Sequence, residues 1–301
     1  VNGQAADGNI DVIGSTVNGQ KIELNAAKDV NLRAADNTNT SHTTTNESSS
    51  SIGIRGTSVT VGASKANGNE NETAVTHTQT KVTASDTLTI KSGNDTNITG
   101  AQAKGDTVKV EVGGNLNLAS QQNTDKYTER SSSAGGSIGF GPTGVSGSGS
   151  FSKGKTDSTY ASVTEQSGIY AGSGGFDVKV GGNTDLKGAV IDSNATPDKN
   201  KLETGTLTYS DIQNKAEYDS SSIGVNVGFG KGTEKKDQGI TPNIGVPASG
   251  DAESTTKSAV SPGTIIVGGK EVSPEGLNRD PSGAVNALGK IFDKKTVQEK
   301  Q

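Results

Sequence analysis

Two histidines and a set of aspartates are the residues whose chemistry could suggest catalysis. His42 and His77 each lie in a Thr-rich run. A His-based triad or metal site needs a supporting acid and a shaped pocket, and neither run suggests one. We therefore expect both histidines to be solvated surface residues. The chain has no Cys, so thiolate nucleophiles, disulfides and Cys-ligated metal sites are excluded.

The aspartates raise the alternative of a glycan-cleaving enzyme, because pairs of carboxylates perform that chemistry. The residues concerned are Asp86, Asp95, Asp106, Asp177, Asp185 and Asp192. Most of them lie between strand-like segments, where Asx turns explain an aspartate without catalysis. Aromatic side chains that could stack on sugars are scarce, with five Tyr, five Phe and no Trp. We predict that the chain carries no catalytic residue and is not an enzyme.

Two glycine-rich motifs resemble phosphate-binding loops only superficially. Gly139-Phe140-Gly141 and Gly228-Phe229-Gly230 are not followed by a helix, and neither ends in the GK[ST] of a phosphate-binding loop. The net charge of −5 and the lack of a basic, aromatic-rich face argue against nucleic acid as a partner. The glycine–aspartate repeat of calcium-binding solenoids is absent. We predict no cofactor and no metal site.

Composition restricts the fold more than the length of 301 residues does. Only 28% of the residues are hydrophobic and 3% are aromatic, while 42 are Gly. So few large side chains cannot fill the core of a layered α/β enzyme. A thin-cored β solenoid, an extended low-complexity chain, or a mixture of the two remains. No run of 18 apolar residues or signal peptide is visible, and the absence of Met at position 1 suggests an excised fragment.

Short alternating segments separated by Gly, Asn and Asp predict a parallel β-helix. Leu88 and Val108 are 20 residues apart, as are Ile98 and Leu118. Segments with apolar residues at i and i+2 are typical of half-buried strands. A spacing near 20 fits one solenoid coil, which buries its narrow core only by stacking on its neighbours. The expected fold is all-β: a right-handed parallel β-helix with β-hairpin excursions and one short C-terminal helix.

A second repeat, spaced at roughly 90 residues, overlies the first. Each copy runs from a strand through a polar stretch and a Ser run to an Ile-Gly-apolar alternation, as in Ser220 to Gly230. We interpret these alternations as hairpins that leave the solenoid near residues 48–62, 131–160 and 220–230. One interpretation is a surface hairpin packed on the solenoid flank; another is a strand that pairs with another chain or enters lipid. The candidate membrane or partner contacts are Ile138, Phe140, Val145, Phe151, Ile223, Val225, Val227 and Phe229.

The periodicity ends after residue 230. We predict solenoid repeats with hairpin excursions over 1–230, a linker over 231–262 and a C-terminal segment over 263–301. That last segment contains a strand at 264–267 and a helix at 283–297. The helix rests on an apolar stripe at helical spacing, with Ser282 as its N-cap.

The three Ser-run units, the coil Gly113 to Leu118 (GGNLNL) and the tail Leu288 to Lys295 (LGKIFDKK) resemble two-partner-secretion haemagglutinins. Within that family, the chain is most similar to the C-terminal repeat block of contact-dependent growth inhibition effectors. The resemblance covers about residues 10–232 and 277–301. The secretion domain, the receptor-binding region, the pretoxin motif and the toxin of such effectors are absent here.

The resemblance implies a secreted, cell-surface protein of a Gram-negative bacterium, with a periplasmic stage before target contact. It also implies a non-enzymatic role in carrying a C-terminal toxin across the outer membrane of the target cell. The implied partners are a dedicated outer-membrane secretion partner, the target-cell outer membrane, and a following toxin domain with its immunity protein. The alternative is a passive adhesin stalk, in which the solenoid serves only as a spacer.

Overall fold

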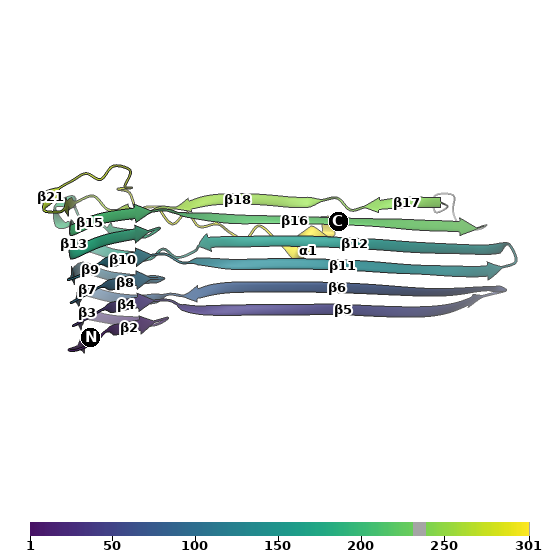
Figure 1. Ribbon diagram of the computed structural model, residues 1–301, viewed down its shortest axis with the longest axis horizontal. Coiled ribbons are helices and arrows are strands. Elements are labelled where there is room, and N and C mark those ends of the chain that lie inside the picture. Colours follow the sequence, from purple (N-terminus) through teal and green to yellow (C-terminus); the bar gives the residue numbers. More distant parts are fainter. Residues whose placement is uncertain (231–238, 301) are drawn as a thin grey trace.

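The computed structural model describes residues 1–230 and 239–300, with side chains up to Val297. Its larger sheet has fourteen strands, which wind as coils into a solenoid (Figure 1). Apart from β21, which pairs antiparallel with β20, the strands pair in parallel. The strands are β1 (Asn2–Ala5), β2 (Ile10–Ile13), β3 (Thr16–Ala26), β4 (Val30–Arg33), β7 (Thr80–Ser92), β8 (Thr96–Thr99), β9 (Ala101–Val112), β10 (Leu116–Ala119), β13 (Gly168–Lys187), β14 (Val190–Ser193), β15 (Lys201–Ser210), β19 (Ala259–Val260), β20 (Thr264–Val267) and β21 (Lys270–Glu271). The 3-10 helix η1 (Pro197–Lys199) precedes β15.

The solenoid core consists of apolar residues stacked in register from coil to coil. One column runs through Leu24, Ile90, Val110, Val178, Leu202 and Ile265, all of them buried. Another runs through Leu32, Ile98, Leu118 and Leu186. Each coil contributes one residue per column, so its apolar surface is covered only by the coils above and below it. The predicted parallel β-helix is confirmed.

The second sheet has seven antiparallel strands that project sideways from the solenoid (Figure 1). Neighbouring hairpins pair with one another, so the strand order is β17-β16-β12-β11-β6-β5, with β18 beside β16. The longest strands have 20 or 21 residues and reach about 65 Å from the solenoid. The strands are β5 (Ala35–Arg55), β6 (Ser58–Thr78), β11 (Gln122–Gly141), β12 (Gly144–Val163), β16 (Ile212–Gly230), β17 (Gly239–Ile244) and β18 (Ala248–Thr256).

The hairpins are longer than the three ranges that the sequence predicts. The polar stretches before the Ser runs, such as residues 35–47, are strands as well and pair along their whole length. Their side chains are polar on both faces of the sheet, so they lack the hydropathy alternation that marks a half-buried strand.

Hairpins leave every second coil at the same corner, after β4, β10 and β15. The coils between them turn that corner at Gly14, Gly100 and Gly188, each with a positive φ of 52° to 60°. Only glycine adopts this conformation without strain. At Gly100 a side chain would also collide with Ala34, because a Cβ would lie 2.7 Å from the Ala34 Cβ.

The predicted linker is wrong over its described residues. Residues 231–238 lie outside the described part of the chain, but β17 and β18 follow them and pair with β16, and β19 joins the solenoid. In β18 one face carries the small residues Ala248, Gly250 and Ala252, and the other carries Asp251 and Glu253. A strand without large apolar residues leaves no hydropathy signal.

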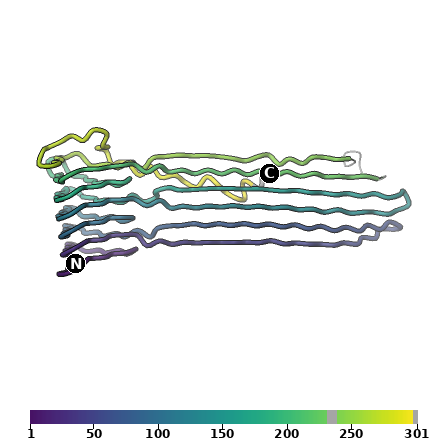
Figure 2. Tube along the Cα trace, in the orientation of Figure 1, coloured from purple at the N-terminus to yellow at the C-terminus, as the bar shows by residue number. Residues whose placement is uncertain are grey.

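The predicted helix over 283–297 is also wrong, since α1 spans only Lys294–Lys300. Gly283 and Asn286 have positive φ values of 69° and 41°, which a right-handed helix does not contain. Ser282 is no N-cap here: its backbone N–H and its hydroxyl both donate to Asp280. Residues 284–297, here called the C-terminal strap, lie across one face of the projecting sheet (Figure 2).

The strap contacts strands of all three hairpins near the solenoid. The Thr256 hydroxyl donates to the Val285 carbonyl, and the Tyr160 hydroxyl donates to the Leu288 carbonyl at 2.8 Å. The Phe292 ring packs between Tyr127 and Tyr218, with ring centroids 5.0 and 5.8 Å apart. Two ion pairs continue across the sheet, Lys290 with Asp125 and Lys294 with Glu70.

Replacement of a corner glycine should destabilise the solenoid. We expect Gly100→Ala to lower the unfolding free energy by about 2 kcal/mol or more, because it adds left-handed strain to steric overlap. Gly53→Ala, on an exposed strand with nothing within 4 Å of the added Cβ, is the matched control and should be nearly neutral. Denaturant unfolding measures both; equal stability of the two variants would contradict the role of the corner.

Removal of the Phe292 ring should loosen the strap. We expect Phe292→Ala to cost about 3 kcal/mol and to speed amide exchange across 284–297, because the ring fills the space between two tyrosines. Lys295→Ala, at an exposed position of the same segment, should leave the exchange unchanged. Hydrogen exchange by mass spectrometry distinguishes the two, and unchanged protection in Phe292→Ala would show that the ring does not hold the strap.

Candidate functional site

Strand register places the apolar residues of the hairpin tips on a single face of the projecting sheet. Residues opposite one another in antiparallel strands share a face, and so do residues two apart in one strand. Ile52 pairs with Val61, and Val61 pairs with Ile138. Residues that lie opposite one another on successive strands form a row across the sheet. In the row next to this one, Phe140 lies between Val59 and Val145. The rows of all three hairpins therefore form one continuous surface, here called the apolar face.

The structure brings all eight sequence-predicted contact residues onto this face, and all are exposed. They are Ile138, Phe140, Val145, Phe151, Ile223, Val225, Val227 and Phe229. Sequence reasoning missed further exposed members of the same face, which are Ile52, Ile54, Val59, Val61, Ile240 and Ile244. The first four show the same alternation and could have been included; the last two lie in the range predicted as a linker.

Glycine on the central strand makes room for the aromatic side chains of the apolar face. Phe229 lies opposite Gly147, and a Cβ at Gly147 would be only 2.5 Å from the Phe229 ring. The ring thus covers the bare backbone of the neighbouring strand, which explains why β12 alternates glycine with serine near its tip.

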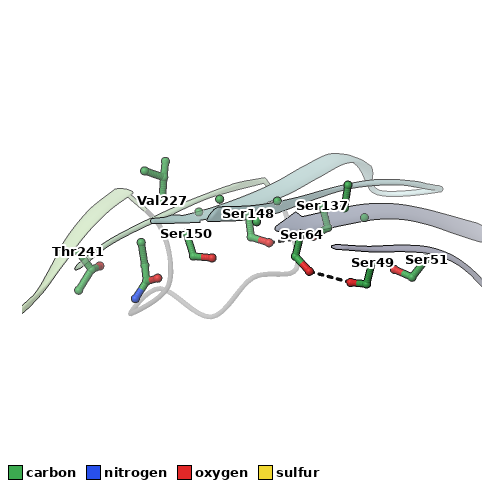
Figure 3. A pocket seen from close by; sticks show the side chains of 15 residues that line it. Ser49, Ser51, Ser64, Ser137, Ser148, Ser150, Val227 and Thr241 are labelled. Carbon is green, nitrogen blue, oxygen red and sulfur yellow. Dashed lines mark hydrogen bonds between the residues drawn. The ribbon is translucent and has the colours of Figure 1, made fainter. Parts of the chain in front are cut away.

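The opposite face of the tips carries small polar residues. Figure 3 shows Ser64, Ser148 and Ser150 on one side of the sheet and Val227 on the other. A shallow groove of about 580 Å³ runs along the serine side. Cross-strand hydroxyl pairs line it, among them Ser49 with Ser64 at 2.7 Å and Ser137 with Ser148 at 2.8 Å. The tips are therefore amphipathic across the thickness of a single sheet.

Charged residues lie on the apolar face between its apolar rows and the solenoid. Asp157 receives hydrogen bonds from Arg130 at 2.6 Å and from Lys155 at 2.9 Å. Burial opposes ionisation of the Asp157 carboxyl, but these two cations outweigh it and lower its pKa below the ordinary value. The carboxylate is therefore charged at neutral pH and holds both basic side chains.

The histidines and aspartates that could suggest catalysis form hydrogen bonds with neighbouring backbone and side-chain groups. Asp95 accepts a hydrogen bond from the backbone N–H of Asn115 at 2.7 Å, and Asp106 accepts one from Ser173 at 2.9 Å. His77 is not solvated as expected: its side chain is only 11% exposed at the base of the first hairpin, where its Nδ1 lies 2.8 Å from Asp36. His42 is exposed on β5 and contacts Asn71. Among the described residues, no group of three His, Asp or Glu side chains is arranged to hold a metal ion.

Comparison with known proteins identifies the family. The "Hemagglutinin repeat" family model matches residues 1–134 and 128–225. The chain belongs to the haemagglutinin-repeat family. No solved structure matches it.

Relatives of this haemagglutinin-repeat chain include long bacterial toxins. "Toxin CdiA" of Escherichia coli is 38% identical over 97% of the chain, and the match spans 10% of that protein. "tRNA nuclease CdiA" of the E. coli strain STEC_O31 is 44% identical over 71% of the chain and 7% of that protein. "Deoxyribonuclease CdiA" of Yersinia pseudotuberculosis is 40% identical over 99% of the chain and 29% of that protein. The chain thus corresponds to a structural repeat segment of CdiA proteins. In the described part of this segment, no helix is both long and apolar enough to cross a membrane.

Charge on the apolar face should leave folding intact. Phe140 and Phe229 are 53% and 54% exposed, so we expect Phe140→Asp with Phe229→Asp to change the unfolding free energy by about 1 kcal/mol or less. Leu118→Ala, which opens a cavity in the haemagglutinin solenoid, should cost about 2–5 kcal/mol. Thermal unfolding measures both; a large loss of stability in the aspartate variant would show that the face packs against the protein itself.

Proposed function

We propose that this chain is the non-enzymatic translocation segment of a contact-dependent inhibition toxin. In this role it helps to carry a C-terminal toxin across the outer membrane of a target cell. The observation that carries the proposal is the apolar face, because it is continuous, exposed and displayed on a sheet that extends away from the solenoid. Large exposed apolar patches are typical of membrane or protein interaction sites.

The relatives support a role for this segment that is separate from the toxic activity. Their names describe toxins and nucleases, and the chain spans about a tenth of the length of the first relatives. We infer that any toxic activity belongs to another part of such a protein. The partners in this proposal are a dedicated outer-membrane secretion partner, the target-cell outer membrane, and a following toxin domain with its immunity protein. The protein would be secreted to the surface of a Gram-negative cell, with a periplasmic stage before target contact.

Strand lengths favour this role over that of a passive adhesin stalk. A stalk gains length from coils, which rise about 4.8 Å each. Here the hairpin strands β5, β6, β11 and β12 have 20 or 21 residues each, and they project sideways from the solenoid instead of adding coils to it. The chain therefore places much of its length in a lateral surface that adds nothing to the reach of a stalk.

The test uses the full effector that carries this segment, with Phe140→Asp and Phe229→Asp. We expect normal surface display and attachment but loss of toxin delivery into target cells, because two carboxylates oppose entry of the apolar face into lipid. The matched control, Phe140→Leu with Phe229→Leu, keeps the face apolar and should deliver normally. Unchanged delivery by the aspartate variant would overturn the proposal and favour the stalk.

A further inference from the structure

Basic residues of the projecting sheet are confined to one face over four of its strands. Register places every Lys and Arg of β6, β11, β12 and β16 on the apolar face: Lys65, Lys126, Arg130, Lys153, Lys155 and Lys215. The acidic residues Glu70, Glu72, Asp125 and Glu129 lie on the opposite face, where the strap brings Lys290 to Asp125 and Lys294 to Glu70. In β12 and β16, Asp157, Glu217 and Asp219 share the apolar face with the cations, so the sheet separates its charges across its thickness only in β6 and β11.

Two of these cations border the apolar rows directly. Lys153 lies opposite Ile223, two residues from Phe151. Lys65 lies opposite Ala134, whose other neighbour is Phe151. Both lysines are exposed, and neither forms an ion pair with another described residue. Arg130 and Lys155 lie one row closer to the solenoid than Lys153, and both form ion pairs with Asp157.

This order of side chains matches the profile of a lipid monolayer. Apolar residues at the tips suit the acyl region, and cations at their border suit the headgroup phosphates. Lys65 and Lys153 project from strands separated by β11, which lie about 10 Å apart. Both flexible cations therefore lie within reach of headgroups in one anionic surface.

We infer that the apolar face binds a phosphate-rich anionic lipid surface, with Lys65 and Lys153 meeting the headgroups. This inference rests on the proposed function, because the face must first contact a membrane. It adds the class of lipid: an anionic surface is selected over a neutral one by cations that border the apolar rows.

The test measures binding of the purified chain to vesicles of phosphatidylcholine, with and without phosphatidylglycerol. We expect tighter binding to the anionic vesicles, with a dependence on salt. Lys65→Gln with Lys153→Gln should weaken binding to anionic vesicles by about 30-fold, the effect of removing two cations from such a surface, and leave binding to neutral vesicles unchanged. Lys65→Arg with Lys153→Arg keeps the charge and should bind normally.

A matched control removes two exposed lysines of the solenoid, Lys109→Gln with Lys179→Gln, and should bind as the unchanged chain does. If the control variant loses as much affinity for anionic vesicles as Lys65→Gln with Lys153→Gln does, net charge alone is responsible and the inference is wrong. Equal binding of the unchanged chain to both kinds of vesicle would overturn the inference and leave the proposed function standing. If the unchanged chain binds neither kind of vesicle, both the inference and the proposed function are wrong. Phe140→Asp with Phe229→Asp should lose binding to both kinds of vesicle.

Discussion

The distance between hydrogen-bonded strands is the constraint on which the rest of the structure depends. Coils of the solenoid and strands of the projecting sheet both stack at about 4.8 Å. A hairpin has two strands, so it occupies the height of two coils, and hairpins leave every second coil. Neighbouring hairpins therefore meet at pairing distance, and β6 pairs with β11 as regularly as β11 pairs with β12. The glycine corners at Gly14, Gly100 and Gly188 make this alternation possible, because they turn the intervening coils without an insertion.

Register then sorts the side chains of the sheet. Because every junction is antiparallel and continuous, residues of one kind remain on one face across three hairpins. A shift of one residue at the β6–β11 junction would place Ile138 among the serines and break the apolar face in two. The strap adds a second restraint at the base, since Phe292 packs between tyrosines of β11 and β16 and Lys294 reaches Glu70 of β6. Among the described residues no comparable segment covers the tips, and the apolar side chains that they carry are exposed.

The sequence predicts the solenoid well because its signals are local. Apolar residues at i and i+2, turn residues between them and a spacing near 20 identify the coils. The polar hairpin strands and β18 lack such signals, since a single-layer sheet in water needs no apolar side chain. Leu288 and Phe292 are spaced as in a helix, yet tyrosines of the projecting sheet hold them in an extended strap. The eight contact residues are predictable as an alternating pattern, whereas their common face depends on pairing between different hairpins, such as that of Phe151 with Val225.

Both sheets have edge strands on the same side of the molecule. The solenoid ends in β1 and β2 on one side, and the projecting sheet ends in β5 on the same side (Figure 1). β5 contains no proline or lysine, the residues with which proteins commonly protect a sheet edge, whereas Pro242 lies in β17 at the other edge. A repeat stacked on the β5 side would add two coils and two hairpin strands, about 10 Å in each sheet. Within the chain, each hairpin adds its strands to the same apolar face, so the width of that face and the length of the solenoid increase together.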